Sequence, residues 1–350
     1  MNISFNDKVW ASKRRTRALF MILVACALSA LNIFIEKIYA QSEKALSSYD
    51  PFSLYFITFV ASAVLLSCAL TVLSYENKHY LWIAPAVSAV IIAALYILLG
   101  ASPASVLLSL AFIPSATVIS VCISHGCEKT HTVVAGATVT GTVFLLALLL
   151  DHYAVFGEIS EGSLTYTLNL LRDSFLEFYK EYNYAGLGIN ASMLSSAFDA
   201  AILMTPSLLC ALAAVVSYIT ASISRLTVLG QGALSEKLLY WPLKMSRLAS
   251  FVFLSAFLIA ALSASGENAV IVLSAINVMI ALLPGFFLVC VRSSFIHVRK
   301  PGFFGMIFGI FLLISCIQNP AMILILVSTL GAIDNLFSSY RARLYGETKK

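Results

Sequence analysis

Charged residues are scarce in this sequence. Only 11% of its 350 residues are Asp, Glu, Lys or Arg, whereas 60% are hydrophobic. A soluble domain of this length is about one-quarter charged. The chain has too little polar surface to fold as a soluble globule, so the composition predicts an all-α, polytopic membrane protein.

Recognisable catalytic motifs are also lacking. The sequence contains no H-E-x-x-H, no G-x-S-x-G and no phosphate-binding G-x-x-x-x-G-K-[ST] pattern. These absences argue against the common zinc proteases, serine hydrolases and nucleotide hydrolases. We therefore predict that the protein is not an enzyme and carries no cofactor. The net charge of +5 needs no nucleic-acid partner to explain it.

Cysteine and histidine gather in one place, but without a metal-site pattern. In the segment 121–131, zinc would accept the Cys, His and Glu side chains as ligands, yet their spacing matches none of the usual zinc motifs. We predict an ordinary helix–turn–helix and no metal. The seven cysteines of the chain lie in predicted spans or at their cytoplasmic edge, so a disulfide framework is not expected. The segment is VCISHGCEKTH, with Cys122, His125, Cys127, Glu128 and His131.

Long apolar runs dominate the rest of the chain. The first follows a basic stretch and is long enough to span a bilayer, so we predict a retained helix rather than a cleaved signal. The break QNP at 318–320 suggests a turn near the end, and 302–338 forms either two spans or one broken helix. The ten predicted spans are 18–38, 52–74, 80–100, 104–124, 131–151, 199–223, 247–265, 268–291, 302–318 and 320–338.

The basic residues are distributed unevenly between the two sides of these ten spans. All Lys and Arg residues except Lys37, Lys44, Arg172 and Lys180 fall on one side. The positive-inside rule assigns that side to the cytoplasm. We therefore predict a single transmembrane domain over 18–338 in the cytoplasmic (inner) membrane. The basic N-terminus (1–17) and the basic tail (339–350) would then both be cytoplasmic.

Two segments between spans are too polar to cross a membrane. The outer loop 152–198 carries apolar residues at helical spacing over about 164–182, which predicts an amphipathic helix. This helix either lies on the outer leaflet or the bundle, or forms a lid over an outward-facing cavity. The inner segment 224–246 predicts a short interfacial helix. The apolar face of the outer helix comprises Leu164, Leu168, Leu171, Phe175, Phe178 and Tyr182.

Polar and helix-breaking residues single out the span 268–291. Asn277 lies at mid-depth, and Pro284 and Gly285 follow seven and eight residues later. Proline removes a backbone donor and bends a helix, while glycine permits close approach. A bent helix with a mid-membrane amide can form the wall of a ligand cavity, or it can hold helices together.

The last span contains an acid within the segment STLGAIDNLFSSYRAR. Asp334 is close to the basic residues Arg341 and Arg343, and Arg292 ends an earlier span on the same side. A buried acid is costly in a membrane unless it is paired. Asp334 is therefore a structural cap or inter-helix pair, a proton or ligand site, or a free interfacial acid.

These C-terminal features resemble the YybS-like family of uncharacterised bacterial multi-pass membrane proteins. That family is distantly similar to the S components of energy-coupling-factor transporters. The resemblance implies capture of a small solute, with a separate transmembrane coupling subunit and ATPases as partners. It also implies that the terminal glycine, acid and arginine act as one unit. The resemblance rests on Gly331, Asp334 and Arg341, on the stretch from Asn277 to Gly285, and on Trp241 and Pro242.

Two functions remain open at this level. The first is a transporter or an S-component-like subunit that binds a small solute in the lipid bilayer. The second is a structural or assembly scaffold of the cell envelope without transport activity. A polar-lined cavity beneath the outer helix would favour the first, and a filled bundle would favour the second.

Overall fold

The fold consists of α-helices joined by short turns in the part of the chain that the structure describes. The computed structural model describes residues 15–31, 51–99, 109–160, 191–229, 245–262, 269–297 and 320–346, with a few single positions between them. No strand occurs within these ranges. The all-α prediction is therefore confirmed for them.

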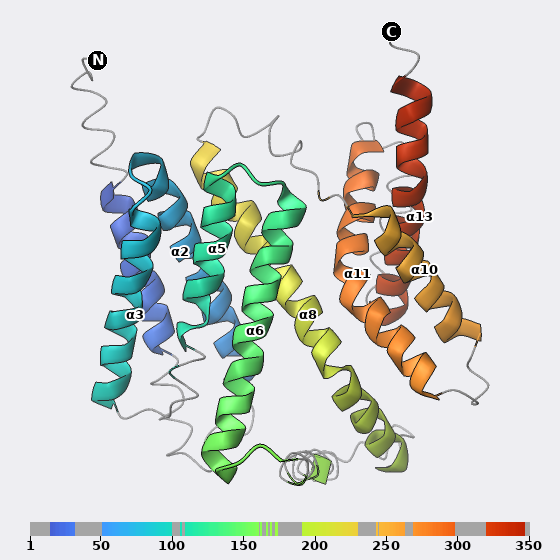
Figure 1. The fold of residues 1–350 in the computed structure, drawn as a ribbon, viewed down its shortest axis with the longest axis horizontal. Helices are drawn as coiled ribbons and strands as arrows, with labels where there is room; N and C mark the ends of the chain where they lie inside the picture. Colours follow the sequence, from blue (N-terminus) through green and yellow to red (C-terminus); the bar gives the residue numbers. More distant parts are fainter. Residues whose placement is uncertain are drawn as a thin grey trace. The chain divides into compact units, whose positions relative to one another are not determined.

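The helices follow the predicted apolar runs. The predicted span 302–318 lies outside the described residues, as does most of the segment 224–246. The predicted span 104–124 contains a shorter continuous helix than expected. The helices are residues 15–31, α2 (Pro51–Glu76), α3 (Tyr80–Leu99), α5 (Phe112–Ser124), α6 (Lys129–Phe156), α8 (Ala191–Leu229), α10 (Arg247–Leu262), α11 (Ala269–His297) and α13 (Pro320–Gly346) (Figure 1).

Several of these helices match the requirements of a membrane span. In the described part of the chain, four stretches are long and apolar enough to cross a bilayer: Ile57–Ser74, Tyr80–Leu98, Ile202–Thr227 and Val270–Cys290. Three shorter apolar helices accompany them within the described residues: Phe112–Ser124, Arg247–Leu262 and Ile323–Phe337. Length and composition thus support a membrane protein, while the count of ten spans stays a prediction.

The chain folds into two compact units. Unit 1 comprises 1–167 and 213–242, and unit 2 comprises 168–212 and 243–350. The boundary falls inside α8, so this single helix contributes its C-terminal part to unit 1 and its N-terminal part to unit 2. The single transmembrane domain expected over 18–338 stays a prediction.

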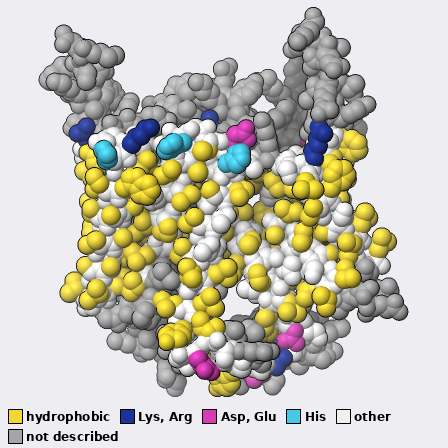
Figure 2. Space-filling view, in the orientation of Figure 1, with side chains coloured by type: hydrophobic (Ala, Val, Ile, Leu, Met, Phe, Trp, Pro, Cys, Tyr) yellow, Lys and Arg dark blue, Asp and Glu magenta, His cyan; other side chains and the backbone are white. Residues whose placement is uncertain are grey.

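In unit 1, helix α5 packs against α2, α3 and α6. The turns α2–α3 and α5–α6 lie at the same end of this unit (Figure 1). Lys, Arg and His side chains gather at that end, above a surface rich in apolar side chains (Figure 2). Lys78, His79, His125 and His131 all belong to these turns or to the helix start that follows. The arrangement matches a helix bundle with one basic face.

Small hydroxyl side chains fill much of the interior of unit 1. Ser67 and Thr71 on α2 lie 3.1 and 3.3 Å from the Ser120 hydroxyl on α5, and the hydroxyls of Ser115 and Thr140 are 2.7 Å apart. All five residues are essentially inaccessible. Such residues let membrane helices approach closely and hydrogen-bond across the interface.

Unit 2 is built around α11. This helix packs against α10 and α13, which also contact each other. The rings of Phe253 and Phe286 lie 5.1 Å apart at 51° in the apolar centre. Ala256, Ala275 and Ala332 fill the space around them, so small side chains bring these helices close together.

A buried cation stabilises the junction of α6 and α8 in unit 1. Lys129, the first residue of α6, is only 8% exposed, and its Nζ lies 4.0 Å from the centroid of the Tyr218 ring. A desolvated cation–π contact contributes about 2 kcal/mol. We expect Tyr218→Leu to lower the free energy of unfolding by about this amount. Chemical denaturation of the purified protein in detergent would measure the change.

The matched control for this prediction is Tyr218→Phe. Phenylalanine keeps the aromatic face but loses the hydroxyl, so most of the stability should remain. If the two variants lost equal stability, the ring would not act on Lys129 as a cation–π partner.

Candidate functional site

A direct contact between helix backbones lies at Gly331 of α13. A Cβ atom built on Gly331 would lie 2.0 Å from the carbonyl oxygen of Phe286 on α11, and 3.1 Å from the Cβ of Cys290. Contacts below 3.0 Å require one of the two groups to move. Only glycine fits here, because the obstructing atom belongs to backbone rather than to a flexible side chain.

Two polar residues on the same face of α13 make three hydrogen bonds to its neighbours. The Ser328 hydroxyl donates to the carbonyl of Leu283 on α11 at 3.1 Å. One turn beyond Gly331, the Asn335 amide donates to the carbonyl of Met245 at 3.1 Å and to the Ser250 hydroxyl at 2.9 Å. Asn335 therefore fastens α13 to the start of α10. Sequence reasoning missed this residue, whose only signal was an amide one turn after a glycine in an apolar helix.

Asp334, the acid that the sequence predicts as a site residue, is half-buried beside this contact face. Arg341 belongs to the last turns of α13, but its side chain and that of Arg292 lie outside the described residues. Pairing of the acid with either arginine stays a prediction. In the described part of unit 2, Gly331 and Asn335 attach α13 to its neighbours, and the role of Asp334 stays a prediction.

Asn277 forms a polar cluster between α11 and the N-terminal part of α8. The Ser207 hydroxyl donates to Oδ1 of Asn277 at 2.7 Å. The Asn277 amide donates to the carbonyl of Leu203 on α8 at 3.2 Å and to that of Leu273 on its own helix at 3.1 Å. Both helices continue through an internal proline: Pro206 directly precedes Ser207 in α8, and Pro284 follows Asn277 by seven residues in α11. Sequence reasoning identified Asn277 but not its partner Ser207.

Gly285 supports a third contact, between α11 and the chain that precedes α10. A Cβ atom on Gly285 would lie 2.8 Å from Cε and 3.0 Å from Sδ of Met245. Met245 thus touches α11 through its side chain, while its carbonyl accepts the Asn335 hydrogen bond. Gly285, Asn335 and Met245 consequently act together, whereas Asn277 belongs to a separate cluster.

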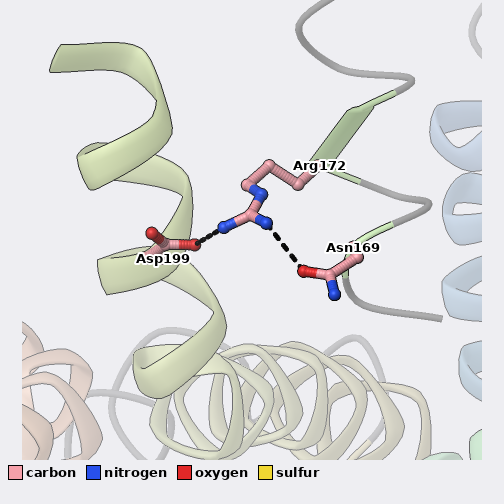
Figure 3. A network of polar contacts seen from close by, with 3 residues as sticks. All are labelled: Asn169, Arg172 and Asp199. Atoms are coloured by element: carbon pink, nitrogen blue, oxygen red, sulfur yellow. Dashed lines mark hydrogen bonds and ion pairs between the residues drawn. The ribbon is translucent and has the colours of Figure 1, made fainter. Parts of the chain in front are cut away.

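An ion pair connects the segment before α8, which the sequence predicts as an outer loop, to the beginning of α8. Nη1 of Arg172 lies 3.3 Å from Oδ1 of Asp199, and Nη2 donates to the Asn169 side chain at 2.7 Å (Figure 3). The side chains of Arg172 and Asp199 are 32% and 52% exposed. Four positions of the predicted amphipathic helix 164–182 are described, and the rest of it lies outside the described residues.

The Cys/His segment forms a helix stop. Gly126 has φ 71°, its N–H donates to the carbonyl of Ile123, and the N–H of Cys127 donates to the carbonyl of Cys122 at 2.9 Å. This pair of bonds is a Schellman motif, which requires a left-handed residue at the glycine position. No group of three or more His, Cys, Asp or Glu side chains in the described residues is placed to hold a metal ion.

Comparison with known proteins identifies no relative of this chain. No protein-family model, no curated protein and no solved structure matches the chain. The resemblance to the YybS-like family therefore stays a prediction. The functional assignment depends on the contacts of the two helix junctions, one at Asn277 and one at Gly331 and Asn335.

Proposed function

We propose that the protein is a multi-pass transporter, or a binding subunit of one, that takes up a small polar solute beside Asn277. In this proposal ten spans cross the cytoplasmic membrane and both termini are cytoplasmic. The observation that supports it best is the amide cluster that joins the proline-containing helices α8 and α11.

The chemistry of this cluster suits a polar ligand. Pro206 has no N–H, so the carbonyl of Ile202 lacks its usual helical donor. The carbonyl of Leu203 one residue later accepts from Asn277. In membrane transporters, backbone carbonyls that lack their helical donor at membrane depth contribute to water-filled cavities and substrate sites. Asn277 and Ser207 are both half-buried, which leaves part of each side chain accessible to a solute.

The lack of a nucleotide-binding motif means that the energy for transport would come from partner proteins. An energised transporter of this type would need a separate transmembrane coupling subunit and ATPases, as the resemblance to S components implies. The chain itself would supply the solute site and its outer cover.

The test of this function is the recovery of a solute with the intact protein. Full-length protein, purified in mild detergent, would be analysed by native mass spectrometry for bound small molecules, and candidates would be returned in a thermal-shift titration. A saturable solute that raises the unfolding temperature supports the proposal. No bound solute, and no ATPase module purified with the protein, would rule against it.

A scaffold function is the second candidate, because helices in both units approach very closely. A Cβ atom on Gly136 would lie 2.9 Å from both Ile119 Cγ1 and the Ser217 hydroxyl in unit 1, and Gly331 abuts backbone in unit 2. Tight, filled bundles favour helix–helix assembly over solute capture. This candidate predicts that partner proteins, but no solute, are recovered.

The Arg172–Asp199 pair provides a prediction for the outer cover. We expect Asp199→Asn to change the free energy of unfolding by less than about 1 kcal/mol, because exposed ion pairs contribute little. The same substitution should speed release of bound solute, since it detaches the loop from α8. Stopped-flow measurement of solute release would detect the change.

The exchanged pair Arg172→Asp with Asp199→Arg should restore slow release. Asp173→Asn serves as the control, because Asp173 is an exposed acid next to Arg172. Equal release rates for wild type and Asp199→Asn would show that the ion pair does not restrain a lid.

A further inference from the structure

Unit 1 carries an apolar groove of about 200 Å³ that is separate from the cluster at Asn277. One wall is the helix 15–31, which contributes Leu19 and Ile22. The other wall is α3, which contributes Ile83, Ala84 and Val87. The side chains of three lining residues are at least half exposed: Leu19 at 57%, Ile83 at 55% and Val87 at 50%. The groove therefore opens onto the apolar outer surface of the unit.

One end of the groove is cationic. Arg15 lines it together with Tyr80, and Lys78 and His79 immediately precede Tyr80 in the exposed α2–α3 turn. Trp82 is 70% exposed two residues further on. Tyrosine and tryptophan concentrate at the level of lipid headgroups. These residues place the cationic end at the membrane–water interface and the apolar part of the groove within the hydrocarbon layer.

The dimensions agree with an extended hydrocarbon chain. The lining residues recur at helical spacing over eight residues on each wall, seven steps along the helix, from Arg15 to Ile22 and from Tyr80 to Val87. Seven residues of α-helix rise about 10 Å. An open apolar groove of this length with a cation at its interfacial end fits the headgroup-proximal part of an acyl chain and its anionic headgroup.

We propose that this groove binds an anionic phospholipid, with one acyl chain between the helix 15–31 and α3 and with the phosphate beside Arg15 and Lys78. The proposal rests on the membrane orientation given under the proposed function, but not on solute binding. In that orientation the cationic end faces the cytoplasmic leaflet, where anionic lipids attract basic side chains.

The experiment compares two lipids on the full-length protein in detergent. Phosphatidylglycerol and phosphatidylcholine with identical acyl chains would be titrated separately, and retained lipid would be counted by native mass spectrometry. We expect phosphatidylglycerol to bind at least about fivefold more tightly, since one basic residue near an anionic surface contributes about that factor. Inorganic phosphate should not compete. Equal binding of the two lipids, or competition by phosphate, would overturn the proposal.

Three variants locate the site. Arg15→Gln should reduce the preference for phosphatidylglycerol about fivefold, while Ala84→Phe should displace both lipids because it fills the groove without changing charge. Arg247→Gln removes an exposed arginine at the start of α10, in unit 2, and should leave binding unchanged. If Arg247→Gln matched Arg15→Gln, binding would reflect general surface charge and the groove would not be the site.

Solute binding would be measured on the same preparations. Loss of lipid preference with intact solute binding contradicts only the groove. Intact lipid preference without any solute contradicts only the transport proposal. Lys78→Gln provides a second charge variant if Arg15→Gln does not fold.

Discussion

Gly331→Ala is expected to lower the free energy of unfolding by about 3 kcal/mol. The new methyl group would lie 2.0 Å from the Phe286 carbonyl oxygen, so α13 and α11 must separate. Overpacking of a close-packed interior, including the backbone shifts that it forces, costs about 1–3 kcal/mol, and a contact with backbone leaves little room for relief at lower cost. Separation would also stretch the Ser328 and Asn335 hydrogen bonds, which join α13 to its neighbours. Reversible denaturation in mixed micelles would measure the loss.

Two other helical glycines provide graded controls. A Cβ atom on Gly141 would meet nothing closer than the Ala213 Cβ at 4.0 Å. We therefore expect Gly141→Ala to stabilise α6 by up to about 1 kcal/mol, through its higher helix propensity. The change in the free energy of unfolding for Gly285→Ala should lie between those of the other two variants, because the obstructing Met245 side chain is flexible. If Gly331→Ala behaved like Gly141→Ala, the α11–α13 backbone contact would be refuted.

Asn277→Leu is expected to weaken solute binding at least about tenfold, equivalent to about 1.4 kcal/mol. Leucine removes the amide that bonds Ser207 and the Leu203 carbonyl, and it offers a solute no polar group. Membrane inter-helix hydrogen bonds contribute up to about 1.7 kcal/mol, so a moderate loss of stability should accompany the change. Isothermal titration and thermal unfolding would separate the two effects.

Asn335→Leu is the matched control for Asn277→Leu. It removes another amide that bonds a neighbouring helix, so stability should fall by a similar amount while solute affinity is retained. Ser207→Ala should weaken affinity less than Asn277→Leu, because it removes one hydroxyl and keeps the amide. If both leucine variants weakened binding equally, Asn277 would be a packing residue and the scaffold function would gain support.

The existence and order of the helices could be predicted from the sequence, because long apolar runs have few alternatives in a bilayer. The helix ends were less accurate. α8 begins at Ala191, before the predicted 199, and α6 continues to Phe156 beyond the predicted 151. Hydropathy marks the part of a helix in the membrane, whereas the hydrogen-bonded helix continues into the polar layer. α6 ends where Gly157 adopts φ 72°, and α13 begins at Pro320 as predicted, because proline suits the first turn of a helix.

The candidate site was predictable only in part. Asn277 and Gly331 stand out as a polar residue and a glycine within apolar helices. Ser207 does not, because it lies 70 positions from Asn277 and serine is common in membrane helices. Asn335 was not predicted, because a charged residue in a membrane helix is energetically more costly than an amide and the sequence therefore favours its neighbour Asp334 as the site residue. Choosing between adjacent residues requires knowing which face of α13 meets α10, and this depends on packing rather than on sequence.

The division of α8 between the two units has a consequence for biosynthesis. The chain enters unit 2 after Thr167, returns to unit 1 at Ala213 and leaves it again after Pro242. A ribosome that has made α2 to α6 therefore cannot complete unit 1 until the second half of α8 has emerged. The first half of α8 belongs to unit 2, whose helices α10, α11 and α13 are synthesised only afterwards. Neither unit is a continuous stretch of the chain, so cutting the chain at one point yields neither unit alone.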